Sequence, residues 1–110
     1  MNYDVQVSDN FKKEAKRLIK KYRSLKAEIT QLVEELETDP TKGTPLGNGI
    51  YKIRLAVASK GKGSSGGVRV LSLVKITKSN VLLFAIYNKG ERDTITAKEI
   101  KELLKELDSK

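Results

Sequence analysis

The chain has 110 residues, of which 38% are hydrophobic and 33% are charged, which is typical of a folded domain with one modest core. It contains no cysteine and no histidine, which excludes disulfide bridges, thiolate metal sites and the commonest general base. No apolar run approaches the roughly 18 residues of a membrane span, and the first residues lack the pattern of a signal peptide. We therefore expect one cytoplasmic domain over residues 1–110, with no membrane segment, metal or cofactor.

The net charge of +8 is distributed unevenly along the sequence. Residues 40–90 contain nine lysines or arginines and no aspartate or glutamate, whereas the acidic residues gather mainly in residues 28–39 and near the C-terminus. Such segregation predicts a strong positive potential over part of the surface, which suits a polyanion such as nucleic acid. A basic protein with solvated lysines is the alternative interpretation.

The predicted elements begin with a short strand over residues 3–7. Ser8 then caps a helix with apolar residues at helical spacing, and a second helix starts near Ser24 and ends at Asp39-Pro40. Because only two residues separate the apolar stripes, the helices are expected to fold back as a hairpin. The outward face of the first helix is basic, and that of the second is largely acidic.

Three strands follow, over residues 50–58, 68–76 and 81–87. In the first of them, Lys52 and Arg54 alternate with apolar residues and share one face. The third is apolar throughout, as expected of a strand covered on both sides, and it forms a hairpin with the second. A capping box of Thr96 and Glu99 then starts a C-terminal helix.

The order β-α-α-β-β-β-α predicts an α+β fold. We expect a mostly antiparallel four-stranded sheet, an N-terminal helical hairpin and a C-terminal helix. The helices are expected to lie against one face of the sheet.

The stretch ASKGKGSSGGVRV, residues 58–70, contains the pattern G-x-G-x-x-G. A dinucleotide-binding turn needs a helix after these glycines and an acidic residue about 20 positions later. Here a strand follows, and no acidic residue occurs between these glycines and Glu91, so we reject that interpretation. We interpret the stretch as a long hairpin loop whose backbone N–H groups, with Lys60 and Lys62, contact phosphate. A loop tip with chance lysines is the alternative.

The segments YKIRLAVASKGKGSSGGVRV and FAIYNKGERDTIT resemble the RelE/ParE superfamily of bacterial type II toxins. The glycine-rich loop that ends in an arginine is most similar to the HigB-type, RelE-like branch, and the resemblance covers nearly the whole chain. It implies a RelE-like fold and a ribosome-dependent endoribonuclease that cuts mRNA in the decoding site. It also implies that a cognate antitoxin holds the toxin inactive.

The resemblance assigns the family's basic and strand-end groups to particular positions of this sequence. Those positions are Lys52 and Arg54, Arg69 at the start of the next strand, Tyr87 and Lys89 at the end of the last strand, and Arg92 in the turn that follows. Thr96 stands where some RelE members carry a catalytic tyrosine, so a phenolic acid or base here would have to be Tyr87.

RNA can be cleaved by attack of its own 2′-hydroxyl on the adjacent phosphate, a reaction that requires no metal. Arg54 and Arg69 suit stabilisation of the phosphate charge, and Tyr87 suits proton donation or base stacking, a core aromatic being the alternative. The candidates for general base are Lys52, Lys60 and Lys89. The basic face of the first helix is expected to follow rRNA phosphates, or else to be solvated: Lys12, Lys13, Lys16, Arg17, Lys20 and Lys21.

We expect the sheet to gather these cations, with no carboxylate among them, into one concave pocket. The predicted partners are the ribosome, mRNA and an acidic, partly disordered antitoxin. Two other functions stay open at this point: a ParE-like inhibitor of DNA gyrase, and a non-catalytic nucleic-acid-binding partner of an antitoxin.

Overall fold

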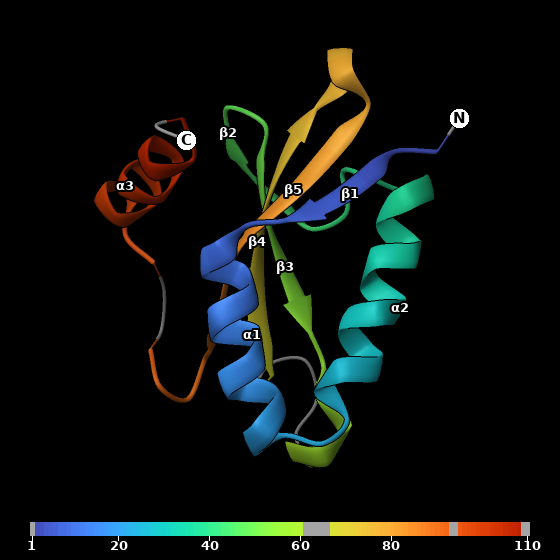
Figure 1. Ribbon diagram of the computed structural model, residues 1–110, viewed down its shortest axis with the longest axis vertical. Helices are drawn as coiled ribbons and strands as arrows, with labels where there is room; N and C mark the ends of the chain where they lie inside the picture. Colours follow the sequence, from blue (N-terminus) through green and yellow to red (C-terminus); the bar gives the residue numbers. More distant parts are fainter. Residues whose placement is uncertain (1, 61–66, 93–94, 109–110) are drawn as a thin grey trace.

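Figure 1 shows the computed structural model, which describes residues 2–60, 67–92 and 95–108; the side chains of Lys60 and of residues 106–108 lie outside that description. The elements follow the chain in this order: β1 (Asp4–Val7), α1 (Asp9–Lys21), α2 (Leu25–Thr38), β2 (Thr44–Gly47), β3 (Ile50–Leu55), η1 (Ala58–Lys60), β4 (Val68–Lys75), η3 (Ile76–Lys78), β5 (Asn80–Asn88) and α3 (Ala97–Asp108). None of the helices in this part of the chain is long and apolar enough to cross a membrane.

The described strands form one sheet in the order β1-β5-β4-β3-β2. Neighbouring strands are antiparallel except for the parallel pair β1–β5, so the predicted α+β fold with a mostly antiparallel sheet is confirmed. The prediction of four strands is wrong, because β2 adds a fifth strand at the edge. All four β2 residues are exposed and one is Pro45, so this strand shows neither alternation nor an apolar run.

The predicted helical hairpin is present and packs on the sheet (Figure 1). Ser8 Oγ accepts a hydrogen bond from the Phe11 N–H at 3.1 Å and caps α1. One stripe of α1 is buried through Phe11, Ala15 and Leu18. The corresponding buried residues of α2 are Leu25, Leu32 and Leu36.

Helices cover both faces of the sheet, so the expectation of helices against one face is wrong. The hairpin packs on one face, in a core that includes Leu18, Leu36, Val70 and Leu83. Helix α3 packs on the opposite face, where its residues Ile100, Leu103 and Leu104 contact a core of Ile50, Leu71, Phe84 and Ala85. Since β4 and β5 are apolar on both faces, each face needs a cover.

A β-bulge near the middle of β5 redirects the side chains that follow it. Phe84 is the extra residue in the register between β4 and β5. Its carbonyl accepts hydrogen bonds from the side chains of Ser8 and Asn10, at 3.4 and 3.1 Å, which ties β5 to the start of α1. Beyond the bulge, Ala85 and Tyr87 face the side of the sheet on which α3 packs.

Candidate functional site

Three of the predicted site residues lie in one row across neighbouring strands. Arg54 of β3 pairs with Arg69 of β4, and Arg69 pairs with Tyr87 of β5. Residues directly opposite each other in antiparallel strands project from the same face, with Cβ atoms about 4.5–5.5 Å apart. We call Arg54, Arg69 and Tyr87 the arginine–tyrosine row. It lies on the face that α3 covers in part.

Lys52 lies on the same face as the arginine–tyrosine row, one pair of residues along. Its register partner Leu71 belongs to the core under α3, so Lys52 marks the boundary between the covered part of the face and the row. Lys52 is half-buried and Arg54 is exposed. The predicted shared face of Lys52 and Arg54 is therefore present, and the strand register adds Arg69 to it.

The arginine–tyrosine row is buried at Arg69 and Tyr87 and open at Arg54. Arg69 is 3% exposed and Tyr87 is 4% exposed, so a base cannot stack on the Tyr87 ring in this conformation. The Arg69 guanidinium donates to the Val68 carbonyl at 3.4 Å. Among the residues that the structure describes, no group forms a hydrogen bond with the Tyr87 hydroxyl.

Gly67 allows the strand ends beside the row to approach closely. A Cβ at this position would lie 2.1 Å from the Leu55 carbonyl oxygen, and the Gly67 carbonyl accepts a hydrogen bond from the N–H of Lys89, whose side chain is exposed. This glycine therefore has a packing role. The predicted phosphate contacts of the preceding loop stay predictions, because Lys62 and the side chain of Lys60 lie outside the described residues.

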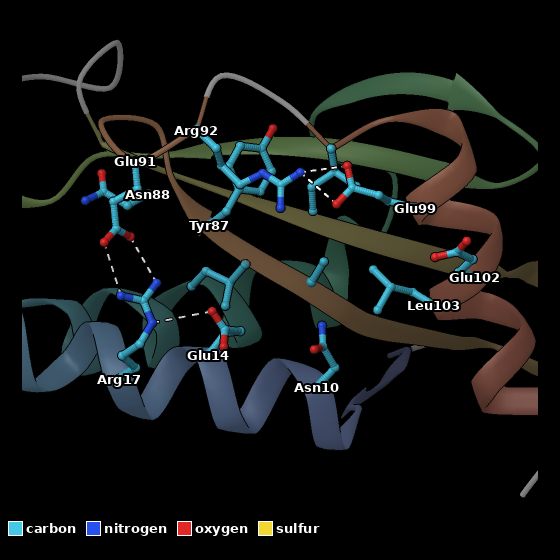
Figure 2. Close-up of a pocket in the computed structure, with 13 residues that line it drawn as sticks. Asn10, Glu14, Arg17, Tyr87, Asn88, Glu91, Arg92, Glu99, Glu102 and Leu103 are labelled. Carbon is cyan, nitrogen blue, oxygen red and sulfur yellow. Dashed lines mark hydrogen bonds and ion pairs between the residues drawn. The ribbon is translucent and has the colours of Figure 1, made fainter.

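Arg92 lies over Tyr87 and forms an ion pair with α3 (Figure 2). Its guanidinium carbon is 5.9 Å from the ring centroid, and its Nη2 donates to both carboxylate oxygens of Glu99, each at 2.7 Å. Glu99 also accepts from Thr96 N–H, while Thr96 Oγ accepts from Glu99 N–H, both at 3.2 Å, which confirms the predicted capping box. The hydrogen bond from Arg92, and then that from the Thr96 backbone, hold the pKa of Glu99 below its ordinary value.

Arg17, a predicted phosphate contact on α1, is also paired with carboxylates (Figure 2). It donates to both Glu91 carboxylate oxygens, at 3.2 and 2.9 Å, and its Nε lies 3.4 Å from Glu14. The hydrogen bond to Glu91 raises the pKa of Arg17. Because Glu91 binds α1 and its neighbour Arg92 binds α3, the segment after β5 bridges the two helices.

A cleft of about 490 Å³ lies between α1, the end of β5 and α3 (Figure 2). Tyr87, Arg17 and Arg92 line it, together with four glutamates: Glu14, Glu91, Glu99 and Glu102. The expectation of a concave pocket free of carboxylates does not hold for this cleft, because the chain fold brings acidic residues of α1 and α3 to it. Within the described ranges, no group of three or more side chains is arranged to hold a metal ion.

The lysines of α1 border a second, apolar groove. The lysines of α1 that were predicted to contact phosphate, Lys13, Lys16 and Lys20, are exposed. Two of them lie with Lys12 along one side of the helix, because Lys12, Lys16 and Lys20 follow one another at intervals of four residues. The groove measures about 440 Å³ and lies between α1 and α2. Its apolar lining is Val7, Phe11, Ala15, Ile19 and Ile29. The described lining contains lysines and no carboxylate, so the groove suits a ligand that is apolar in part and acidic in part.

The structure also shows a polar cluster at the base of the glycine-rich stretch. The N–H groups of Ser24 and Ser59 each donate to the other serine's hydroxyl, at 3.3 and 3.0 Å. Glu28 accepts from the Ser24 hydroxyl at 3.1 Å and from Ala58 N–H at 2.8 Å. These bonds attach the end of the β3 side of the hairpin to the turn between α1 and α2. These contacts could not be predicted from the sequence, because contacts between such distant segments produce no periodic pattern.

Residues 8–109 match the family model described as the RelE toxin of the RelE/RelB toxin-antitoxin system. The chain belongs to the RelE toxin family. This match confirms the resemblance to the RelE/ParE superfamily, whereas the HigB-type branch within it stays a prediction.

Two solved structures of RelE-family toxins share the fold. The first is a mutant of the Escherichia coli toxin RelE in the free state, with a TM-score of 0.64 and 18% identity over 96% of this chain and 98% of that one. The second is the RelBE2 toxin-antitoxin complex from Mycobacterium tuberculosis, with a TM-score of 0.60 and 18% identity over 80% of this chain and 92% of that one. At this level of identity the comparison supports the architecture alone.

Proposed function

We propose that this RelE-family chain is a ribosome-dependent endoribonuclease that cuts mRNA and inhibits translation. The observation that carries the proposal is the arginine–tyrosine row, which places two arginines and a tyrosine at neighbouring register positions on one face of the sheet. Family membership supports a toxin of a toxin-antitoxin system. On this proposal, residues 1–110 form one toxin domain that acts in the cytoplasm.

The proposed reaction is attack of the RNA 2′-hydroxyl on the adjacent phosphate. The phosphate then gains negative charge, and the 5′-oxygen leaves with a proton. Arg54, which is exposed, supplies a forked, permanently charged donor to the phosphate oxygens, and the buried Arg69 beside it adds a second permanent positive charge. Because Arg69 is buried within a paired strand, its position is fixed before substrate binds, which is what electrostatic stabilisation of a transition state requires.

The proton-transfer roles fall to the remaining polar groups near the row. Lys52 shares a face with Arg54 and is our first candidate for the general base, with Lys89 at the end of β5 as the second. Tyr87 is our candidate to donate a proton to the leaving oxygen. Lys60 and Lys62 stay candidates for contacts with flanking phosphates.

The decisive experiment compares Arg54→Ala with Lys75→Ala in cells that express the toxin. Both residues are exposed, so each variant is expected to keep its stability to within about 0.5 kcal/mol. Arg54→Ala removes a phosphate ligand from the row and is expected to lower cleavage by about 10²–10³-fold. Lys75 is the last residue of β4, away from the row, and its removal is expected to have no effect. Primer extension on cellular mRNA measures the cuts.

Three outcomes would contradict the proposal. Codon-phased cuts of equal strength in wild type and Arg54→Ala would remove the row from the chemistry. Intact mRNA together with broken gyrase–DNA complexes would favour a ParE-like inhibitor instead. The absence of both effects in wild type would favour a non-catalytic role.

We also propose that the toxin is neutralised by an acidic antitoxin, part of which binds the groove between α1 and α2. The RelBE2 structure contains a toxin with its antitoxin, and the net charge of +8 suits an acidic partner. Lys16 and Lys20 border the groove beside an apolar floor, an arrangement that fits a helix with an apolar stripe flanked by carboxylates. On this proposal, these α1 lysines bind a protein rather than rRNA.

A further inference from the structure

We propose that Arg92 and Glu99 form a removable cover over Tyr87, and that an RNA phosphate opens the cover by drawing Arg92 away from Glu99. The identity of the phosphate rests on the proposed function. The cover itself rests on the contacts among these three residues, which belong to β5, to the segment after it and to α3.

The closed state buries the Tyr87 hydroxyl away from water. The Tyr87 ring is 4% exposed, Arg92 lies over it, and none of the described residues forms a hydrogen bond with its hydroxyl. A buried hydroxyl without a partner is unfavourable, because it has lost its hydrogen bonds to water. Opening the cover gives this hydroxyl access to water or to a substrate oxygen. The free-energy cost of burying this hydroxyl therefore favours opening.

The contact that holds the cover is of the kind that a phosphate can replace. The Arg92 and Glu99 side chains are 41% and 40% exposed, and exposed ion pairs contribute little to stability. Guanidinium groups bind phosphate oxygens with the same donors that they offer to a carboxylate. A phosphate beside Arg54 and Arg69 would thus compete with Glu99 for Arg92 at a site where the other guanidinium groups already favour it.

Opening needs only a side-chain rotation, because the backbone at Arg92 is fixed. The N–H groups of Glu91 and Arg92 donate to the Asn88 carbonyl at 2.9 and 3.1 Å. The Asn88 side chain in turn binds the Tyr22 hydroxyl at 2.8 Å, and Glu91 pairs with Arg17 of α1. These bonds anchor the turn to α1 whether or not Arg92 contacts Glu99. Helix α3 has contacts of its own with the sheet, through Ile100, Leu103 and Leu104, which do not involve Arg92.

The first experiment measures the exposure of Tyr87 by nitration with tetranitromethane, followed by mass spectrometry of the peptides. Glu99→Gln is expected to raise the nitration rate of Tyr87 about two- to fivefold, the range by which losing an exposed ion pair shifts an equilibrium. Glu102→Gln removes the same charge one turn further along α3 without touching Arg92, and it is expected to leave the rate unchanged. High salt is expected to raise the rate in wild type and not in Glu99→Gln.

The folding of the variants can be checked separately from the exposure of Tyr87. A glutamine at position 99 can still accept the Thr96 N–H, so the capping box survives, and circular dichroism verifies the helix. Arg92→Ala removes the cover directly and is expected to nitrate at least as fast as Glu99→Gln. Equal Tyr87 rates in Arg92→Ala and wild type, or in Glu99→Gln and Glu102→Gln, would overturn the cover.

The second experiment tests the phosphate as the group that opens the cover. The probe is a single-stranded RNA whose 2′-O-methyl groups prevent cleavage. Glu99→Gln is expected to bind it about two- to fivefold more tightly, with a salt slope steeper by about 0.7, the value for one additional phosphate contact. In an Arg92→Ala background the same substitution is expected to have no effect. An undiminished effect in that background would show that Glu99 acts through its charge alone, and it would overturn this part.

The two proposals fail in different ways. Nitration and binding as expected, but no mRNA cleavage by wild type, would support the cover and contradict the nuclease. Cleavage that depends on Arg54, together with a nitration rate of Tyr87 that Arg92→Ala does not change, would support the nuclease and contradict the cover.

Discussion

The two faces of the sheet differ in how completely helices cover them. On one face, α1 and α2 together bury a continuous core, and its residue Leu18 is fully buried. On the other face, the single helix α3 covers the part around Leu71 and Phe84. The rest of that second face holds the arginine–tyrosine row. We call the first the closed face and the second the half-open face. We expect the closed face to provide most of the stability, whereas the half-open face holds the candidate site.

The half-open face is also the one whose contacts can be exchanged. Arg92 and Glu99 meet in an exposed ion pair on this side of the sheet, whereas the closed face is built from apolar contacts. Apolar packing is lost only by unfolding, whereas an exposed ion pair exchanges with ligands and with salt. We therefore expect substitutions on the two faces to differ in their effects on stability and on cleavage.

Truncating one leucine on each side should separate the two faces by stability. Leu18→Ala leaves a cavity in the closed core and is expected to cost about 3 kcal/mol of unfolding free energy. Leu103→Ala removes a partly buried side chain of α3 and is expected to cost about 1 kcal/mol. Urea denaturation of both variants measures the difference. Equal losses would show that α3 is as integral to the core as the hairpin.

Each face also buries one hydroxyl that has no hydrogen-bond partner among the described residues: Ser72 on the closed face and Tyr87 on the half-open face. Ser72→Ala and Tyr87→Phe are each expected to leave stability unchanged or to raise it by up to about 1 kcal/mol, because an unsatisfied group is removed. Only Tyr87→Phe is expected to slow mRNA cleavage. Thermal unfolding and primer extension measure the two effects.

Stability and cleavage measurements on Ser72→Ala and Tyr87→Phe can each contradict these expectations. A stability loss above about 1 kcal/mol in either variant would mean that its hydroxyl has a favourable partner. Full cleavage by Tyr87→Phe would remove the phenol from the proposed chemistry while leaving the arginines in it.

The smallest effect concerns the acid titration of the cover. The Arg92 hydrogen bond lowers the pKa of Glu99 below its ordinary value of 4.5, so the pair contributes fully above pH 4.5 and is lost as the pH falls through the lowered pKa. Carboxyl carbon-13 NMR should show Glu99 titrating below 4.5, and Arg92→Ala should move its pKa upward. A Glu99 pKa that Arg92→Ala does not change would show that the pair is absent in solution.

Much of the fold could be predicted, because its elements are encoded in short-range patterns. The apolar spacing after Ser8 and the capping box at Thr96 and Glu99 are both present in the structure. The edge strand β2 was not predicted, since an exposed strand that contains Pro45 has no apolar face to reveal it. The apolar pattern of β5 indicated a strand covered on both sides, but the helices were expected against one face alone.

Less of the candidate site could be predicted. Alternation in β3 placed Lys52 and Arg54 on one face, because the side chains of a strand project to opposite sides in turn. The partners of Arg17 and Arg92 were not predicted, since Glu91 lies 74 residues from Arg17 and Glu99 projects from a separately packed helix. The burial of Tyr87 agrees with the alternative of a core aromatic, whereas the position of Arg92 over its ring was not predicted.

Local sequence pattern was sufficient for the helices, three of the strands after α2, the charge segregation and the family. These properties depend on neighbouring residues, whose spacing can be read directly along the chain. The pairing of Arg54 with Arg69 and Tyr87, and of Arg92 with Glu99, emerged only from the folded molecule. Strand register and helix docking decide such contacts, and both are set by packing of the whole core rather than by any one segment.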